Sequence, residues 1–136
     1  MKPWVHVVVG IVLISILVGG IGWIINNVSS DLALPPLDNA LAQRGLEVAQ
    51  DHGCIACHTL DGSTGIGPTW VGLYGKTETL TDGSTVVVDE AYIRESIVAP
   101  SARQVEGYED LMIRYYLSQE DLDALVEFTR QLSKDS

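Results

Sequence analysis

The sequence predicts an all-α domain with a small β-hairpin insertion, preceded by one N-terminal transmembrane helix. Three observations lead to this fold class. An uncharged, mostly apolar run of 23 residues occupies positions 4–26. Behind it, apolar residues recur at helical spacing in capped segments near 39–52, 89–99 and 118–132. Only residues 76–88 show two short β-prone runs around a turn.

Residues 1–28 form the predicted transmembrane anchor. At about 1.5 Å per residue the run at 4–26 makes a helix of roughly 34 Å, enough for a hydrocarbon core of about 30 Å. Trp4 and Trp23 stand near its two ends, where indole rings favour the interface between lipid and water. The alternative is a signal peptide cleaved after small residues at 28–30. The run is longer than the roughly 7–15 residues of a signal-peptide core, which favours the anchor.

Charge and spacing predict how this helix is placed. Lys2 is the only Lys or Arg before Arg44, which favours the N-terminus inside and the following domain outside. His6 is expected at the headgroup interface rather than as a ligand within the membrane. Four small or weakly polar residues share one face and allow another transmembrane helix to approach, although ordinary glycine usage is the alternative. They are Ser15, Gly19, Gly22 and Asn26.

Residues 29–38 are a predicted linker, which Pro35 and Pro36 stiffen. Its reach is at most about 30 Å, so the domain at 39–136 stays close to the membrane surface. The chain carries 18 Asp and Glu against 8 Lys and Arg, a net charge of −10. This acidity excludes nucleic acid as a partner and disfavours docking on anionic lipid by charge alone.

The first part of the domain is predicted as a helix, a loop and a hairpin. Asp38 or Asn39 caps the helix, which runs to about His52 before Gly53 breaks it. Its apolar positions include Leu41, Leu46 and Val48. Residues 59–75 are rich in Gly and Thr and are expected to form a loop. The hairpin follows at 76–88, with Asp82-Gly83 as its turn.

Two further helices complete the prediction. Asp89 caps the second, which Pro100 ends near Ala99. A loop is expected over 101–117, and Ser118 then opens the last helix in a capping-box-like arrangement with Asp121. The predicted buried face of that helix consists of Leu122, Leu125, Val126, Thr129 and Leu132.

The chemistry lies in the pentapeptide Cys54-Ile55-Ala56-Cys57-His58, the attachment motif of c-type haem. Each thiol adds its S–H bond across one haem vinyl group. Two intervening residues let both sulfurs reach neighbouring vinyl groups from one helical turn. His58 is then placed at the iron as the proximal ligand. We therefore predict one covalent haem c, and with it an extracytoplasmic domain.

Other uses of these residues fit less well. A zinc site needs about four ligands, and no Cys or His follows His58. A thioredoxin-like dithiol is expected in a βαβ context, which the mostly helical pattern lacks. A plain disulfide between Cys54 and Cys57 would leave His58 without a role.

The sixth iron ligand decides what such a haem does. The only two methionines are Met1, on the far side of the predicted span, and Met112, in the loop before the last helix. Ligation by His58 and Met112 raises the reduction potential and closes the iron to substrates, which suits electron transfer. The alternative is that Met112 fills the core and the distal site is open. His52 is on the attachment side and is expected at the surface or as a cap.

The stretch from Gly45 to Leu132 resembles a class I cytochrome c, and most closely the haem domain fused to subunit II of caa3-type oxidases. The matching residues are GCIACHTLDGSTGIGPTWVGLYG, TLTDGSTVVVDEAYIRESIVAPSA, GYEDLM and LSQEDLDALVEF. The resemblance implies the class I cytochrome c fold. Ile113 follows Met112 where oxidase-type domains usually have Pro. The chain has no cupredoxin domain or copper ligands, so it is not subunit II itself.

The resemblance also implies roles for single residues. The Pro68 carbonyl is expected to accept a hydrogen bond from the free ring N–H of His58. Gly45 and Phe128 match the residues at the crossing of the first and last helices. Lys76 falls where related cytochromes carry an arginine facing a haem propionate, and Trp70 is expected either at the propionate edge or in the core.

We expect an electron carrier rather than an enzyme in its own right. Our first hypothesis is a small cytochrome subunit of a respiratory or photosynthetic complex in the bacterial cytoplasmic membrane, with its haem domain on the periplasmic side. By resemblance, candidates include the monohaem subunit of alternative complex III and small cytochrome subunits of haem–copper reductases. Its partners would be integral membrane redox subunits and the donor and acceptor proteins. The alternatives are a free-standing, membrane-anchored shuttle, which would dock on basic partner patches, and a haem sensor or peroxidase with an open distal site.

Overall fold

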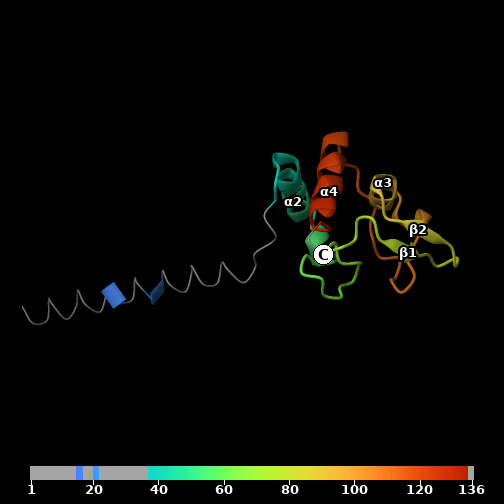
Figure 1. Ribbon diagram of the computed structural model, residues 1–136, viewed down its shortest axis with the longest axis horizontal. Coiled ribbons are helices and arrows are strands. Elements are labelled where there is room, and N and C mark those ends of the chain that lie inside the picture. The colour runs from blue at the N-terminus through green and yellow to red at the C-terminus, as the bar shows by residue number, and fades with distance from the viewer. Residues whose placement is uncertain (1–14, 17–19, 22–36, 135–136) are drawn as a thin grey trace, which may run out of the picture. The chain divides into compact units, whose positions relative to one another are not determined.

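The computed structural model describes residues 15–16, 20–21 and 37–134 (Figure 1). The chain divides into two units, Met1–Ala33 and Leu34–Ser136. Apart from four helical residues at 15–16 and 20–21, the predicted anchor at 1–28 lies outside the described residues, and so does most of the linker. Within the described parts of the chain, no helix has the length and apolar character needed to cross a membrane.

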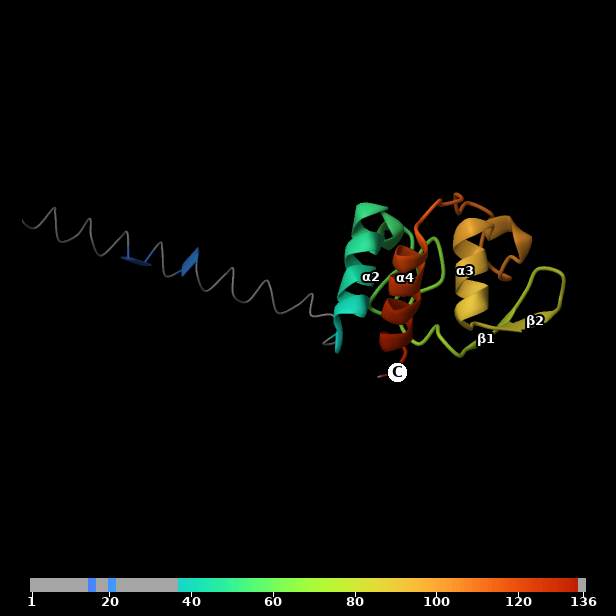
Figure 2. The same ribbon diagram turned by 90° about the horizontal axis from the view of Figure 1, so that it is seen from above.

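The second unit is mainly helical and contains one two-stranded antiparallel sheet, as the sequence predicts (Figures 1 and 2). In both views α4 lies between α2 and α3, and the sheet lies beyond α3. In chain order the elements are α2 (Ala40–Asp51), the 3₁₀ helix η1 (Cys54–Ala56), β1 (Thr77–Thr79), β2 (Thr85–Val87), α3 (Glu90–Val98), the 3₁₀ helix η2 (Pro100–Ala102) and α4 (Gln119–Gln131).

Helix α2 begins at Asn39, whose side chain accepts a hydrogen bond of 2.8 Å from the Ala42 backbone N–H. Of the two expected caps, Asn39 is therefore the one used. Gly53 follows the helix with φ +70°, a left-handed conformation that glycine adopts at no steric cost. The chain can therefore turn directly from α2 into η1, which contains Cys54 and leads to Cys57.

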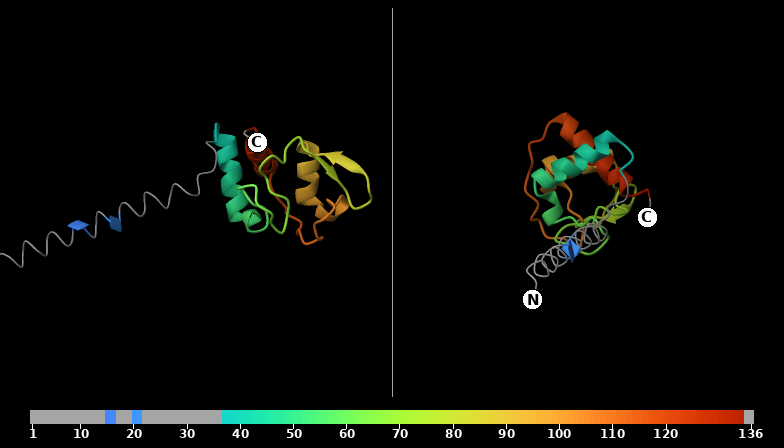
Figure 3. Two further views of the ribbon diagram at one scale, coloured as in Figure 1. Left: turned by 60° about the horizontal axis from the view of Figure 1, so that its bottom comes forward. Right: turned by 90° about the vertical axis from the view of Figure 1, so that its left-hand side faces the viewer.

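Helices α2 and α4 cross where Gly45 meets α4 (Figure 3). A Cβ atom at Gly45 would lie 2.1 Å from the Ala124 carbonyl oxygen and 2.6 Å from the Phe128 Cβ atom. The predicted contact of Gly45 and Phe128 is confirmed. This closeness also explains why Leu41 of the predicted apolar pattern is 45% exposed. The buried residues of α2 are the smaller Ala42, Gly45, Val48 and Ala49.

The hairpin and α3 form the part of the domain away from α2 (Figure 3). Thr77 pairs with Val87 and Thr79 with Thr85, around the predicted turn. Asp89 caps α3 by accepting a 2.8 Å hydrogen bond from the Tyr92 N–H. The predicted loop over 101–117 needs one correction, because its first residues belong to η2. Pro100 starts this turn, since proline is tolerated where a helix needs no N–H donor.

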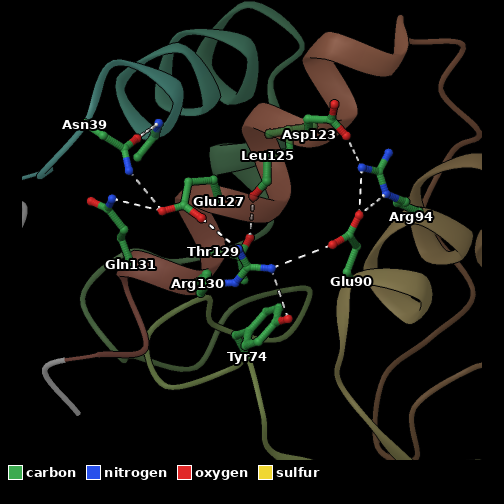
Figure 4. A network of polar contacts seen from close by, with 11 residues as sticks. Asn39, Tyr74, Glu90, Arg94, Asp123, Leu125, Glu127, Thr129, Arg130 and Gln131 are labelled. Carbon is green, nitrogen blue, oxygen red and sulfur yellow. Dashed lines mark hydrogen bonds and ion pairs between the residues drawn. The ribbon is translucent and has the colours of Figure 1, made fainter.

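Helix α4 begins at Ser118, whose hydroxyl oxygen accepts a hydrogen bond of 3.1 Å from the Asp121 N–H, as predicted. All five residues of its predicted buried face are buried, and Phe128 joins them. Polar contacts then tie α4 to its neighbours (Figure 4). Glu127 accepts a 3.0 Å hydrogen bond from the Asn39 amide, and Arg94 of α3 pairs with Asp123.

Candidate haem site

A cavity of about 360 Å³ opens between residues 54–58, called the attachment turn below, α3, α4 and the segment before α4. Ile93 and Ile97 of α3 and Leu125 of α4 are among its apolar walls. Its volume falls in the range of about 300–1,000 Å³ typical of ligand sites. The cavity brings Cys54, Cys57 and His58 together with Met112, although Met112 lies far along the chain.

The attachment turn is a single 3₁₀ turn, closed by local hydrogen bonds. The backbone N–H groups of Cys57 and His58 both donate to the Cys54 carbonyl oxygen, at 3.2 and 3.0 Å. Both cysteines line the cavity, and they are not joined to each other in a disulfide. Burial raises the pKa of Cys54. The turn therefore presents two thiols and an imidazole to one apolar space, as the attachment of c-type haem requires.

The His58 ring is held on two sides. Its Nδ1–H donates a 2.8 Å hydrogen bond to the Pro68 carbonyl oxygen, the contact expected from the resemblance. A Cβ atom at Gly67 would lie 2.6 Å from the His58 Cε1 atom, so only glycine leaves room for the ring. Burial lowers the pKa of His58, and the Pro68 hydrogen bond opposes this effect. The ring is thereby fixed with Nε2 as its remaining nitrogen for a metal.

Trp70 lies directly beside His58. The Trp70 ring stacks on His58, with ring centroids 5.4 Å apart and an interplanar angle of 28°. It also meets Phe128 edge to face, with centroids 5.7 Å apart. Trp70 therefore joins the histidine to the α2–α4 crossing and lines the cavity at the same time.

Met112 lies in the segment 111–117, which has no helix or strand. Its side chain is partly buried, packs against the hydrophobic core and lines the cavity. Among the predicted site residues it is the one that comes from outside the stretch 54–76. A thioether, an imidazole and two thiols around an apolar cavity fit a haem c, because soft sulfur and imidazole ligands suit its iron.

Lys76 is not brought together with the other predicted site residues. Its ammonium group pairs with the Glu78 carboxylate at 2.8 Å. Glu78 lines the cavity, whereas Lys76 is absent from the described lining. Lys76 and Glu78 are two residues apart, so their side chains share one face of this extended stretch and can pair.

The cavity wall contains residues that sequence reasoning missed. Arg103 lies over the Tyr92 ring, 4.9 Å from its centroid, and its guanidinium is bonded to Glu95. Tyr115 lines the same cavity. For Arg103 the sequence carries no signal, because its partners come from α3. The same holds for Tyr115, whose hydrogen-bond acceptors are on Ile97 and His52, far from it along the chain.

Comparison with known proteins decides the family. The family model for cytochrome c matches residues 42–133, most of the second unit. The chain belongs to the cytochrome c family. Family membership and the Cys54–Cys57–His58 motif together establish a covalent haem c as its cofactor. This cytochrome domain therefore serves haem-based electron transfer with redox partners, as members of the family typically do.

Solved structures agree with this assignment. Cytochrome c from Rhodothermus marinus is 27% identical, with a TM-score of 0.54, and the match covers 77% of this chain and 88% of that one. Cytochrome cH from Methylobacterium extorquens is 20% identical, with a TM-score of 0.50, and the match covers 66% and 97% of the two chains. The second likeness shows the fold alone. A search of curated proteins gives no match.

Proposed function

We propose that this cytochrome transfers single electrons through a six-coordinate haem c, attached by Cys54 and Cys57 and ligated by His58 Nε2 and Met112 Sδ. When bound, the haem supplies an iron that takes up one electron from a donor protein and passes it to an acceptor. The observation that carries the proposal is the shared cavity. It places the only methionine of the described residues in the same apolar space as the attachment turn.

The chain's own residues support this role. The His58 Nδ1–H donates a hydrogen bond to the Pro68 carbonyl oxygen, which keeps the imidazole oriented and makes Nε2 a stronger ligand. The apolar walls limit the access of water to the site. This favours electron transfer over the binding of water at the iron. With the Met112 thioether as the second axial ligand, the iron would have no position left for peroxide or dioxygen. This argument favours an electron carrier over a sensor or a peroxidase.

Replacement of Met112 by alanine tests the ligation. We expect Met112→Ala to keep its covalent haem, to have a lower reduction potential and to bind carbon monoxide in the ferrous state. Leu111→Ala is the matched control, because Leu111 lines the same cavity and is 61% exposed. A potential and a carbon monoxide affinity unchanged from wild type in Met112→Ala would remove Met112 from the proposed role.

Charge supports a basic redox partner. Among the described residues, Arg44, Arg94, Arg103 and Arg130 all form ion pairs. Three carboxylates beside the cavity form none: Glu106, Glu109 and Asp110. Glu109 and Asp110 line the cavity, and Glu106 and Glu109 line a shallow groove next to it. These three carboxylates have no ion-pair partner among the described residues, and a basic protein surface would complement them.

We further propose that residues 1–28 anchor the protein in the bacterial cytoplasmic membrane and that the haem domain faces the periplasm. The apolar run at 4–26 and the short linker at 29–38 support this placement. The face with Ser15, Gly19, Gly22 and Asn26 supports packing against another membrane subunit of a respiratory or photosynthetic complex.

Purification in mild detergent tests the proposed assembly. The wild-type protein should migrate with larger membrane polypeptides. Gly19→Leu should be released from them while its haem spectrum is unchanged, because leucine prevents close approach of helices. Val9→Leu, elsewhere in the same run, is the control. A wild-type protein that purifies alone would instead indicate a mobile shuttle, and persistent assembly of Gly19→Leu would contradict the packing face.

A further inference from the structure

The segment that carries Met112 packs against the core but makes few hydrogen bonds to the rest of the domain. Residues 111–117 contain no helix or strand. The Leu111 N–H donates only to the nearby Glu109 carbonyl, at 2.8 Å. Within 111–117, as the structure describes them, the hydrogen bonds to distant parts of the chain all come from one residue, Tyr115.

Tyr115 makes three contacts with two separate elements. Its backbone N–H donates a 3.1 Å hydrogen bond to the Ile97 carbonyl oxygen, in the last turn of α3. Such carbonyls have no partner within their own helix. Its hydroxyl donates a 3.1 Å hydrogen bond to the His52 carbonyl oxygen, two residues before Cys54. The rings of Tyr115 and His52 also meet edge to face, with centroids 5.8 Å apart.

These contacts join the two chain segments that bear the candidate haem ligands. His52 ends α2 and leads directly into the attachment turn, and Tyr115 is three residues after Met112. Met112, Tyr115 and Ile97 all line the cavity. Tyr115 therefore contacts the start of the attachment turn through His52 and the end of α3 through Ile97. Both contacts limit how far the Met112 segment can move from the attachment turn.

We propose that Tyr115 is a positioning residue, which holds the Met112 segment to the attachment turn through the His52 carbonyl and so keeps the Met112 thioether on the iron. The proposal rests on the ligation put forward above. Tyr115 itself touches no ligand atom of the iron in this account. It acts by limiting how often the segment moves away and exposes the distal side of the cavity.

The test compares Tyr115→Phe with Tyr116→Phe. The first removes only the hydroxyl bonded to His52 and keeps both the ring and the backbone N–H. The second removes the hydroxyl of a neighbouring tyrosine that is 88% exposed. The readout is the rate at which carbon monoxide binds the ferrous protein, because the gas enters only when Met112 has left. We expect Tyr115→Phe to bind about two- to tenfold faster than Tyr116→Phe, the range given by the loss of one neutral hydrogen bond.

Covalent haem content should be the same in both variants, and the reduction potential of Tyr115→Phe should be slightly lower. Equal rates for the two variants would overturn the proposal, whatever their unfolding midpoints. A merely structural role would lower the unfolding midpoint without raising the rate. Met112→Ala in the same assay separates the two claims. If Met112→Ala does not speed binding, the proposed ligation fails; if it does and Tyr115→Phe does not, only the positioning role fails.

A second measurement needs no variant. Amide hydrogen exchange in the wild-type haem protein should show the Tyr115 N–H as the most protected amide of the segment 111–117, because it alone donates to a distant carbonyl. Exchange of the Tyr115 amide as fast as that of Arg114 or Tyr116 would contradict the proposal.

Discussion

The crossing of α2 and α4 and the segment from Arg103 to Leu117 are built in opposite ways. At the crossing, the backbone of α2 approaches the Ala124 carbonyl so closely that only glycine fits at position 45. Both helices are capped, and Arg44 of α2 pairs with Asp121 of α4. The segment 103–117 has almost no regular structure after η2 and carries unpaired carboxylates. Close packing supplies a rigid scaffold, and the looser segment supplies a ligand and a contact surface.

Substitutions in the two regions should therefore have different effects. A substitution at the crossing should cost stability first and alter the haem only as a consequence. A substitution in the looser segment should alter ligation or association while the fold persists, because this segment lies outside the α2–α4 crossing. The predictions that follow test this separation.

The largest effect is expected at the crossing. Gly45→Ala places a Cβ atom 2.1 Å from the Ala124 carbonyl oxygen, so the helices must move apart. We expect the free energy of unfolding to fall by about 3 kcal/mol or more, at the upper end of overpacking effects. Chemical denaturation of the haem-loaded protein measures it. Gln43→Ala, at an exposed position of the same helix, should change little. A wild-type unfolding midpoint for Gly45→Ala would show that the crossing is not as tight as described.

An intermediate effect is expected beneath His58. Gly67→Ala sets a methyl group 2.6 Å from the His58 Cε1 atom and pushes the ring away from its hydrogen bond with Pro68. We expect a cost of about 1–3 kcal/mol in stability and a change in the haem spectrum. Pro68→Ala is the control, since the accepting carbonyl belongs to the backbone and remains. If both variants have wild-type spectra and potentials, Gly67 has no steric role in placing the ring.

The smallest effect is expected at the carboxylates, and it should appear in association rather than in folding. Replacing Glu106 and Glu109 by Gln and Asp110 by Asn should slow reduction of the ferric protein by the cation hexaammineruthenium(II) by about threefold or more at low salt. The control makes the same change of charge at Asp38, Asp51 and Glu120, which are outside the described cavity lining. Equal slowing in both sets would mean that only the net charge matters, and the proposed local partner surface would be wrong.

The sequence predicts those features that depend on neighbouring residues. Asn39, Asp89 and Ser118 cap their helices by hydrogen bonds to residues three positions on, so their roles are visible in the chain itself. The attachment turn is equally local. The contact between Gly45 and Phe128 and the hydrogen bond from His58 to Pro68 were expected from family resemblance, and both are present.

Features that depend on tertiary contacts were missed or misplaced. Leu41 reads as apolar helix surface, yet the close crossing is filled by smaller residues and leaves it exposed. The ion pair of Lys76 with Glu78 was not predicted, and the role of Lys76 at a haem propionate stays a prediction. The hydrogen bonds of Tyr115 could not be predicted, because its two acceptors, on His52 and Ile97, are far from it along the chain. None of these outcomes follows from hydrophobic spacing or from a local motif.

The most direct test of the account is the NMR signal of the methionine methyl groups in the reduced protein. The chain contains two methionines, Met1 and Met112, so selective methyl labelling gives two signals and Met1 serves as an internal reference. We predict one signal at an ordinary position and one shifted strongly upfield by the haem ring current, absent from Met112→Leu. Two signals at ordinary positions in a protein that carries its covalent haem would contradict ligation by Met112.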